Sequence, residues 1–312
     1  MKMKRREFLA RSIAGVGGLL LGAGCIDTAR RKPVMFDPYE RVPLGKTNIK
    51  VSRVGFGTGM RGGGRQSNQT RLGKEKFEAL LRASYERGVR LFDLADLYGT
   101  HPYVASTLSK MPRKDYVIST KVWWRRGGIP ETARPDPDVV VERFLDELDT
   151  DYIDLILLHC VDRPNWPDEL GEQMNILAKL KKKGIVRAHG VSCHSLPALA
   201  ACVKEPWVDS VHVRINPYAE KMDVRNVEDI PKVEAVLHAL HKQGKAVIGM
   251  KIIGEGSFRN SDEKRDNSVR YVLNVGCVDA MVVGFEKVEE IDDLAMRVRK
   301  VSRLPKIIKK RA

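Results

Sequence analysis

Short apolar runs alternate with segments of helical periodicity along most of this 312-residue chain. The first pair is an apolar run at residues 54–58 followed by residues 74–87, whose apolar side chains recur about every 3.6 positions until Gly88 ends the segment. Strand and helix alternate through eight units over about 250 residues, which is the number and length of a closed parallel (β/α)8 barrel. The alternation therefore predicts an α/β chain folded as a TIM barrel.

The remaining elements can be placed in the same way. The other expected strands are residues 89–93, 116–121, 153–159, 186–191, 208–213, 246–251 and 280–284. The other expected helices are residues 103–110, 135–148, 169–183, 196–204, 230–243 and 269–273, and one that begins near residue 288. Residues 41–52 alternate around turn residues, which predicts a β-hairpin ahead of the barrel. An open doubly wound sheet is the alternative, but it requires a G-x-G-x-x-G turn that Gly62, Gly63 and Gly64 do not match.

The net charge of +15 lies mostly at the two ends of the chain. Residues 1–32 carry +6 and residues 297–312 carry +8, which leaves +1 for the part between them. A nucleic-acid-binding domain needs its basic residues on a folded face, so the nearly neutral centre argues against this function. No apolar stretch reaches the roughly 18–20 residues of a spanning helix, which argues against an integral membrane protein.

The first 25 residues have the pattern of an export signal. Arg5 and Arg6 precede a moderately apolar, Gly-rich run at residues 12–24, which has the length of a signal h-region. Paired arginines before such a run resemble a twin-arginine signal. We therefore expect residues 1–25 to be a signal peptide for the twin-arginine export machinery, residues 26–38 to be a polar tether, and residues 39–312 to form the barrel domain.

The five cysteines leave several states open. Cys25 follows the sequence LGAG, which is similar to a lipoprotein cleavage box, so the exported protein is either periplasmic or anchored to a membrane by a lipid on Cys25. Cys160 and Cys193 follow neighbouring strands, where they could form a disulfide or contribute to a metal site. Because no Cys-x-x-Cys spacing exists, we expect no metal site, and unpaired packing is the simplest state of these thiols.

Three consecutive predicted strands end in ionisable side chains, namely Asp93, Lys121 and His159. Each follows an apolar run, so burying it is costly unless the group is paired or in contact with water. The carboxyl ends of the strands of such a barrel meet at one mouth, where active sites form. Tyr98 lies in the loop after the first of these strands. These four side chains therefore form a candidate active site.

At these positions the chain resembles the aldo-keto reductase family, from about residue 41 to residue 300. The resemblance rests on the motifs VPLGKT (42–47), VSRVGFGT (51–58), FDxAxxYG (92–99), STK (119–121), LLH (157–159) and GVS (190–192), in this order and spacing. It implies an oxidoreductase that reduces an aldehyde or ketone, or oxidises the matching alcohol, with a nicotinamide cofactor. It also implies that Asp93, Tyr98, Lys121 and His159 are its catalytic residues.

The chemistry of these side chains supports that assignment. Hydride addition to a carbonyl produces an alkoxide that must receive a proton, and a phenol with a pKa near 10 is a reluctant donor–acceptor at neutral pH. We expect the Lys121 ammonium to stabilise the phenolate of Tyr98 and to lower its pKa. Asp93 would keep Lys121 charged and in place. His159 would donate a hydrogen bond to the carbonyl oxygen.

The resemblance places the nicotinamide end of the cofactor at strand ends in the second half of the chain. Ser192 matches the first residue of a Ser-Asn pair that holds the carboxamide, Cys193 replaces the Asn, and His212 replaces a Gln. Met250 stands where many members have a Tyr stacked on the nicotinamide ring, and Lys251 follows it. A thiol is a weak hydrogen-bonding group, and an imidazole bonds through one edge at a time, so the resemblance to the family's carboxamide site is weaker at these positions.

At the adenosine end, members that use NADPH place a Lys and an Arg against the 2′-phosphate, and a Glu and an Asn against adenine. The residues at these positions here are Gly284, Glu290, Asp293 and Leu294, in that order. Glu286 adds negative charge that Lys287 only partly offsets, and carboxylates repel a phosphate. The expected cofactor is NADP(H) first, with NAD(H) or no dissociable dinucleotide as alternatives.

Two functions from different classes are compatible with these residues. The leading one is an exported oxidoreductase that acts on a small carbonyl substrate, with Trp123 and Trp124 as candidate walls of the substrate pocket. The alternative is a catalytically idle barrel that binds a ligand or partner outside the cytoplasm, which the altered adenosine end favours. The sequence names neither the substrate nor the oligomeric state.

Overall fold

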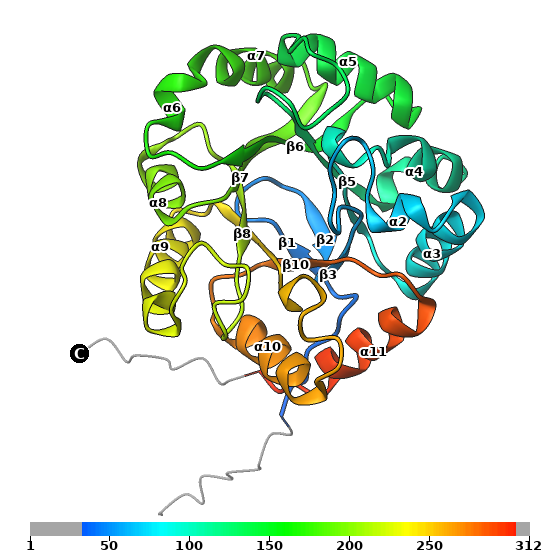
Figure 1. The fold of residues 1–312 in the computed structure, drawn as a ribbon, viewed down its shortest axis with the longest axis vertical. Coiled ribbons are helices and arrows are strands. Elements are labelled where there is room, and N and C mark those ends of the chain that lie inside the picture. Colours follow the sequence, from blue (N-terminus) through cyan, green and yellow to red (C-terminus); the bar gives the residue numbers. More distant parts are fainter. Residues whose placement is uncertain (1–32, 304–312) are drawn as a thin grey trace, which may run out of the picture. The chain divides into compact units, whose positions relative to one another are not determined.

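The computed structural model describes residues 33–303, and its compact unit begins at Met35. In this part of the chain, eight parallel strands close into a barrel that is surrounded by helices (Figure 1). The barrel strands are β3 (Val54–Gly57), β4 (Leu91–Asp93), β5 (Val117–Val122), β6 (Ile153–Val161), β7 (Val186–Cys193), β8 (Ser210–Arg214), β9 (Ala246–Met250) and β10 (Ala280–Val283). Each strand pairs with its neighbour in sequence, and β10 pairs with β3 to close the ring. The predicted TIM barrel is confirmed.

Helices follow the strands as the alternation predicts. The α-helices are α2 (Asn68–Arg71), α3 (Lys74–Arg87), α4 (His101–Leu108), α5 (Pro137–Leu148), α6 (Trp166–Glu169), α7 (Gly171–Lys182), α8 (Leu196–Lys204), α9 (Ile230–Lys242), α10 (Asp262–Asn274) and α11 (Val288–Arg299). Short 3-10 turns lie at η1 (Asp96–Tyr98), η2 (Arg113–Asp115), η3 (Val227–Asp229) and η4 (Gly254–Gly256). Helix α3 ends where expected, because Gly88 adopts a left-handed conformation with φ of 108°.

Two helices differ from their predicted bounds for physical reasons. The segment expected as one helix at residues 169–183 is two, because the chain leaves helical geometry at Leu170, with φ of −112° and ψ of 19°, between α6 and α7. Helix α10 begins at Asp262, seven residues before the predicted start at Val269. Its first turns are polar and are capped by the Ser261 side chain, so the apolar periodicity appears only where the helix reaches the core.

The predicted N-terminal hairpin is confirmed and closes one end of the barrel. Its strands β1 (Arg41–Pro43) and β2 (Lys50–Ser52) pair antiparallel. The hairpin side chains Val42, Leu44, Ile49 and Val51 form one buried cluster with inward-facing residues of the barrel strands. A second and larger cluster lies between the strands and the helices. The barrel is therefore filled with side chains, and the open mouth lies at the carboxyl ends of the strands.

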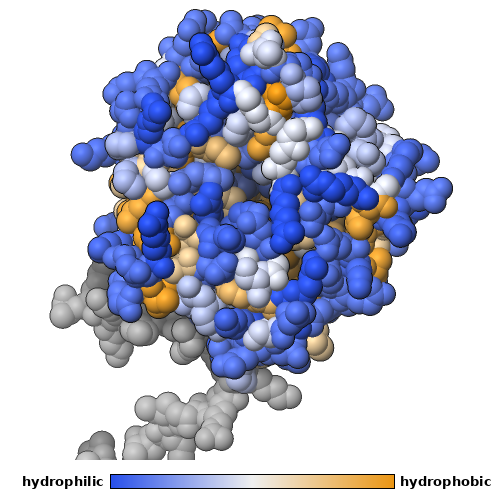
Figure 2. All heavy atoms as spheres, viewed as in Figure 1, coloured by the Kyte–Doolittle hydropathy of each residue, from blue (hydrophilic) through white to orange (hydrophobic). Residues whose placement is uncertain are grey.

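The outer surface is mainly polar. Hydrophilic side chains cover most of the face seen in Figure 2, and hydrophobic residues appear on it in small separate groups. None of the helices in the described part of the chain is both long enough and apolar enough to cross a membrane. The predicted signal peptide and Cys25 lie outside the described residues, as do the first residues of the predicted tether.

Candidate active site

Asp93, Lys121 and His159 meet at the carboxyl ends of β4, β5 and β6, and all three are buried. The Lys121 Nζ atom lies 2.8 Å from each carboxylate oxygen of Asp93 and 2.6 Å from the carbonyl oxygen of Leu94. Burial alone raises the pKa of the Asp93 carboxyl, but the Lys121 charge and the donors around it hold that pKa well below its usual range. The pair is therefore a buried ion pair with its hydrogen bonds satisfied.

Tyr98 completes the group, because η1 turns its side chain toward the other three. Its hydroxyl lies 3.3 Å from Nε2 of His159, and the two rings are nearly perpendicular, with centroids 5.5 Å apart. The Lys121 Nζ atom lies 5.1 Å from the centre of the phenol ring. The four predicted catalytic residues are thus brought together, with Tyr98 and His159 in hydrogen-bond contact and Lys121 facing the ring of Tyr98.

The expected acidic phenol is wrong for the protein without cofactor. Burial raises the pKa of Tyr98 well above its usual value of 10.0, and the charge of Asp93 raises it further. Lys121 does not offset this, because its ammonium donates its hydrogen bonds to Asp93 and Leu94 and not to the phenol oxygen. The hydroxyl of Tyr98 therefore keeps its proton across the neutral range.

His159 is uncharged as well. Burial lowers the pKa of its imidazole well below the usual 6.5, and the nearby Lys121 ammonium lowers it further. Its Nε2 atom contacts Tyr98, and its Nδ1 atom is buried without a hydrogen-bond partner among the described residues. A neutral imidazole can still donate from Nε2 to a carbonyl oxygen, which is the role expected of it.

Two glycines hold the phenol ring from the β3–α2 loop. A Cβ atom on Gly59 would lie 2.2 Å from ring carbons of Tyr98, and one on Gly62 would lie 2.4 Å from another. The ring therefore fits against bare backbone. In the sequence, Gly62 stands out only as part of a run that does not match a dinucleotide-binding motif, and one sequence alone offers no signal for this packing.

Substitution of Gly62 tests this packing. We expect Gly62→Ala to displace the Tyr98 ring and to lower kcat for carbonyl reduction by about tenfold or more, because proton transfer requires hydrogen-bond reach. Gly63→Ala is the matched control, since a Cβ atom there meets nothing within 4 Å. Steady-state kinetics and thermal unfolding of both variants measure the effect. Equal activity in the two variants would contradict the packing role.

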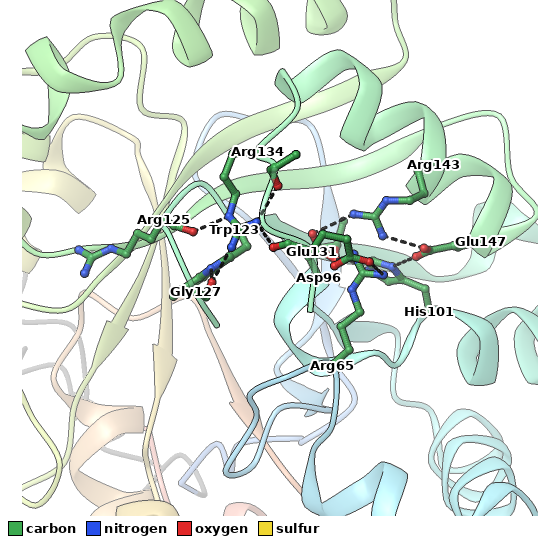
Figure 3. A network of polar contacts seen from close by, with 12 residues as sticks. Arg65, Asp96, His101, Trp123, Arg125, Gly127, Glu131, Arg134, Arg143 and Glu147 are labelled. Carbon is green, nitrogen blue, oxygen red and sulfur yellow. Dashed lines mark hydrogen bonds and ion pairs between the residues drawn. The ribbon is translucent and has the colours of Figure 1, made fainter. Parts of the chain in front are cut away.

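Buried charges fix the turn that carries Tyr98. Asp96, two residues before it, is buried and forms ion pairs with Arg65 at 3.1 Å and with Arg143 at 2.8 Å (Figure 3). Both arginines come from other parts of the chain, the β3–α2 loop and α5. The turn is therefore anchored on two sides, and a single sequence does not reveal this because both arginines are distant from Asp96 along the chain.

A second buried contact supports β5 next to Lys121. His101, the first residue of α4, contacts Oγ1 of Thr120 at 2.7 Å and Oε2 of Glu147 at 2.6 Å. Burial raises the pKa of Glu147, but the contacts with His101 and Arg143 lower it to about 2. Glu147 is therefore ionised, and the chain from α5 through His101 to Thr120 braces the strand that carries Lys121 (Figure 3).

The predicted substrate-pocket tryptophans lie against His159. The Trp123 ring packs edge-to-face on the imidazole with centroids 5.5 Å apart, and its Nε1 donates to the carbonyl oxygen of Gly127 at 2.6 Å. Nε1 of Trp124 donates to the carbonyl oxygen of His159 at 2.8 Å. Trp123 is thus placed to border a substrate at His159, whereas Trp124 braces the backbone of that residue.

An open pocket of about 1020 Å³ extends from Asp93 and Tyr98 past the ends of β9 and β10 to α11. Four predicted cofactor residues line it: Met250, Lys251, Gly284 and Asp293. Three arginines also line it: Arg259, Arg265 and Arg297. A pocket that extends from Tyr98 to α11 fits an extended dinucleotide, which the side chains along it could hold.

The other four predicted cofactor residues do not line this pocket. Ser192 is buried, and its Oγ accepts a hydrogen bond from the Cys160 backbone N–H at 2.8 Å. Cys193 is buried with its thiol 3.6 Å from the thiol of Cys202. His212 is buried with Nε2 3.0 Å from Oδ1 of Asp93. Lys287 is exposed before α11.

The cysteines of the described region are free, so the Cys160–Cys193 disulfide that the sequence left open is not formed. Cys193 packs against Cys202, since the two residues face each other from β7 and α8. The Cys160 thiol instead lies 3.3 Å from Nε2 of His194, and burial raises its pKa to about 11. No group of three or more potential metal ligands occurs within residues 33–303.

Four histidines, three of them buried and His194 partly buried, predict an acid-sensitive fold. Burial is the largest cause that lowers the pKa of each, to about 4 for His189 and about 3 for His194, and in the same direction for His159 and His212. The unfolded chain binds these protons below about pH 6.5, so each histidine costs about 1.4 kcal/mol of stability per pH unit as the pH falls. Asp223 opposes this, because burial raises its folded-state pKa to about 6.

Between about pH 6 and pH 4 the unfolded chain therefore binds the protons that His189 and His194 do not bind in the folded chain, whereas Asp223 binds one in the folded chain, so the free energy of unfolding should fall as the pH is lowered. Urea unfolding at pH 7, 6 and 5 measures this slope. We expect His189→Gln to reduce the slope by about 1.4 kcal/mol per pH unit, because one titrating group is removed far from the proton-transfer site. Stability that stays constant from pH 7 to pH 5 would contradict the neutral buried histidines.

Known proteins resemble this chain in both sequence and fold. The family model described as "Aldo/keto reductase family" matches residues 53–302. The NADH-specific methylglyoxal reductase of Escherichia coli (strain K12) is 31% identical over 173 residues, which are 49% of this chain and 52% of that protein. L-galactose dehydrogenase of Arabidopsis thaliana is 29% identical over 163 residues, 48% of this chain and 47% of that protein. The chain thus spans about half the length of these relatives.

Solved structures agree in fold. The holo form of an aldo-keto reductase from Bacillus halodurans superposes with a TM-score of 0.67 at 19% identity, covering 86% of this chain and 93% of that one. An aldo/keto reductase from Klebsiella pneumoniae in complex with NADP and acetate gives a TM-score of 0.63 at 20% identity, covering 84% and 91%. With the family model matching from the first barrel strand to the end of α11, this chain belongs to the aldo/keto reductase family.

Proposed function

We propose that the protein is a nicotinamide-dependent oxidoreductase that reduces an aldehyde or ketone, with Tyr98 as the proton donor. The observation that carries this proposal is the contact of the Tyr98 hydroxyl with Nε2 of His159 at 3.3 Å, beside the Lys121–Asp93 ion pair and at one end of the elongated pocket. The relatives named as methylglyoxal reductase and L-galactose dehydrogenase support carbonyl chemistry at such a site.

Each residue of the site has a separate role in this reaction. A bound nicotinamide supplies the hydride. His159 orients the substrate by donating to the carbonyl oxygen, and Tyr98 transfers its hydroxyl proton to the same oxygen as negative charge develops there. The tyrosinate that results is stabilised by the Lys121 ammonium, 5.1 Å from the ring centre. Because Tyr98 begins protonated, the site as it stands is suited to reduction, whereas alcohol oxidation requires loss of that proton first.

The charges at the far end of the pocket favour NAD(H) over the NADP(H) that the sequence ranks first. The three arginines there already have carboxylate partners. Arg259 pairs with Glu286 at 2.5 Å, and Arg265 pairs with Asp262 at 2.5 Å. Arg297 is buried and pairs with Asp293 at 2.8 Å as well as with two other carboxylates. A 2′-phosphate would therefore meet compensated guanidinium groups and excess negative charge.

Cofactor titrations test this preference. We expect NADH to quench tryptophan fluorescence with a Kd at least about tenfold lower than that of NADPH, which corresponds to about 1.4 kcal/mol. Glu286→Gln leaves Arg259 without its carboxylate partner. The variant should therefore bind NADPH with a lower Kd, which reduces the difference between the Kd values of NADH and NADPH. Glu289→Gln is the matched control, because it removes the same charge nearby in the chain, and Glu289 is exposed and forms no ion pair with Arg259, Arg265 or Arg297 in the described part of the chain. Tighter binding of NADPH by the wild-type protein would overturn the NAD(H) assignment.

The site that this proposal describes belongs to residues 39–312, the predicted barrel domain. For the N-terminal part we propose export by the twin-arginine machinery and a lipid on Cys25, on the strength of Arg5, Arg6 and the LGAG sequence before Cys25. Because free dinucleotide is scarce outside the cytoplasm, the cofactor would then be tightly held and carried along. Native mass analysis of the purified protein reports the bound nucleotide and the lipid together.

The alternative is an idle barrel that binds a ligand or partner. The paired arginines are the observation in its favour, because they leave less positive charge for a dinucleotide phosphate. Reduction of methylglyoxal and a panel of other aldehydes and ketones with NADH and NADPH separates the two functions. We expect turnover of at least one carbonyl. Cofactor binding without turnover across the panel would favour the idle barrel.

A further inference from the structure

We propose that His212 is a positioning residue of the proton-transfer site, which holds Asp93 from the opposite wall of the barrel and does not grip the cofactor. This inference rests on the proposed reductase function for its kinetic consequences, whereas the contact itself does not depend on that function. It differs from the role that the resemblance implies, in which the residue at this position binds the nicotinamide carboxamide.

The contact crosses the barrel interior. Asp93 ends β4 and His212 lies in β8, and these strands are four places apart in a closed ring of eight. They therefore stand on opposite sides of the barrel. The side chains nevertheless meet, with Nε2 of His212 3.0 Å from Oδ1 of Asp93. His212 has no exposed surface and does not line the elongated pocket.

The hydrogen-bond roles in this contact are determined by the chemistry of the partners. An ionised carboxylate only accepts hydrogen bonds, so the proton of the His212 imidazole lies on Nε2, and this N–H donates the hydrogen bond to Asp93. Nδ1 is then a bare acceptor, and it has no partner among the described residues. Burial lowers the pKa of His212, which keeps the imidazole neutral in this tautomer even though Asp93 acts in the other direction.

The contact with His212 gives one carboxylate oxygen of Asp93 more hydrogen-bond donors than the other. Its Oδ1 atom accepts from three groups: Ser119 Oγ at 3.1 Å, Lys121 Nζ at 2.8 Å and His212 Nε2 at 3.0 Å. Its Oδ2 atom accepts from Lys121 at 2.8 Å. The donor from β8 fixes the carboxylate rotamer and takes up part of its negative charge. The Lys121 ammonium is consequently less neutralised, and more of its charge acts on Tyr98.

Few other charges act on His212. The ionisable groups that interact with it are Asp93 from β4, Lys121 from β5 and His159 from β6, and the imidazole of His159 is uncharged. Its register partners in the neighbouring strands are Ser192 on β7 and Ile248 on β9, and neither carries a charge. A change in pH dependence on removal of this imidazole can therefore be assigned to the Asp93–Lys121 pair.

Two substitutions isolate the donated hydrogen bond. Gln and Met have similar length and neither titrates, but only the Gln side chain can donate to Asp93 from the position of Nε2. We expect His212→Met to lower kcat for carbonyl reduction about tenfold, as the loss of a hydrogen bond to a charged group predicts. The Kd for the nicotinamide cofactor should change by less than about twofold. His212→Gln should restore most of the lost kcat.

An activity-independent measurement accompanies the kinetics. Without its third donor, Oδ1 of Asp93 should take up a proton at a higher pH, so His212→Met should unfold at a higher pH than His212→Gln during acid titration. Coincident acid transitions of the two variants would overturn the proposal. So would a weakened cofactor Kd with unchanged kcat in His212→Met, which would assign His212 to the cofactor. If the wild-type protein reduces no carbonyl, the proposed function fails, and the acid comparison still decides the contact.

Discussion

Tyr98→Phe is expected to lower kcat for carbonyl reduction by at least about 100-fold, because positioned proton transfer contributes roughly 10²–10⁴ to such rates. The ring and its contacts with Gly59 and Gly62 are retained, and only the hydroxyl 3.3 Å from His159 is lost. The Kd of the cofactor should stay the same. Steady-state kinetics and fluorescence titration on the purified variant measure both quantities.

Tyr103→Phe provides the control for this change. Tyr103 lies in α4 with its ring packed against Phe77 at 5.1 Å between centroids, outside the proton-transfer site. Loss of its hydroxyl should leave kcat unchanged within about twofold, since surface and non-site substitutions have small effects. Comparable activity of Tyr98→Phe and wild type would mean that another group donates the proton.

Lys121→Met is expected to remove activity and to destabilise the fold at the same time. The variant leaves the Asp93 carboxylate buried without its main partner, which costs about 3–5 kcal/mol when one member of a buried pair is removed. It also removes the charge that stabilises the tyrosinate, so kcat should fall at least about 100-fold. Urea unfolding and kinetics of the same preparation give the two effects.

A double variant separates the two effects of Lys121. In Asp93→Asn/Lys121→Met no buried charge is left uncompensated, and the Asn oxygen can still accept from Ser119 and His212. We expect this variant to recover most of the stability and none of the activity. Recovery of both would show that Lys121 serves only to neutralise Asp93.

The sequence was sufficient for the fold and for the four side chains that the structure brings together around Tyr98, but half of the predicted cofactor residues do not line the pocket. The barrel was predicted because two sequence patterns alternate. Short apolar runs are typical of buried strands, and apolar residues about every 3.6 positions are typical of amphipathic helices. Asp93, Lys121 and His159 could be found because charged groups directly after apolar strands are rare unless they have partners or a function. The structure brings all three together with Tyr98.

The direction of the Lys121 side chain could not be predicted. The proximity of the Lys121 ammonium to the phenol suggested a lowered pKa for Tyr98. However, the direction of the ammonium depends on which acceptors around it in the folded protein take its hydrogen bonds. Asp93 and the Leu94 carbonyl oxygen take those bonds, and burial then dominates at the phenol. Desolvation of a side chain depends on everything packed around it, which no local motif records.

The supporting contacts were missed for a related reason. Gly62 packs on Tyr98 across 36 residues of chain, and His212 reaches Asp93 across 119. Such partners depend on barrel closure and on side-chain direction, so they have no spacing that a single sequence reveals. Two of the departures from the family pattern that the sequence identified, His212 and Cys193, are at positions where the structure provides another partner.

The protonation of Tyr98 in the cofactor-free protein is the most direct test of this account. Tyrosinate has a near-ultraviolet absorbance that the phenol lacks, and the difference between wild type and Tyr98→Phe isolates one ring among eight tyrosines. We predict that the difference signal stays absent up to pH 10.0, the usual pKa of the group, because the buried hydroxyl keeps its proton. Ionisation of this tyrosine near neutral pH would contradict the account.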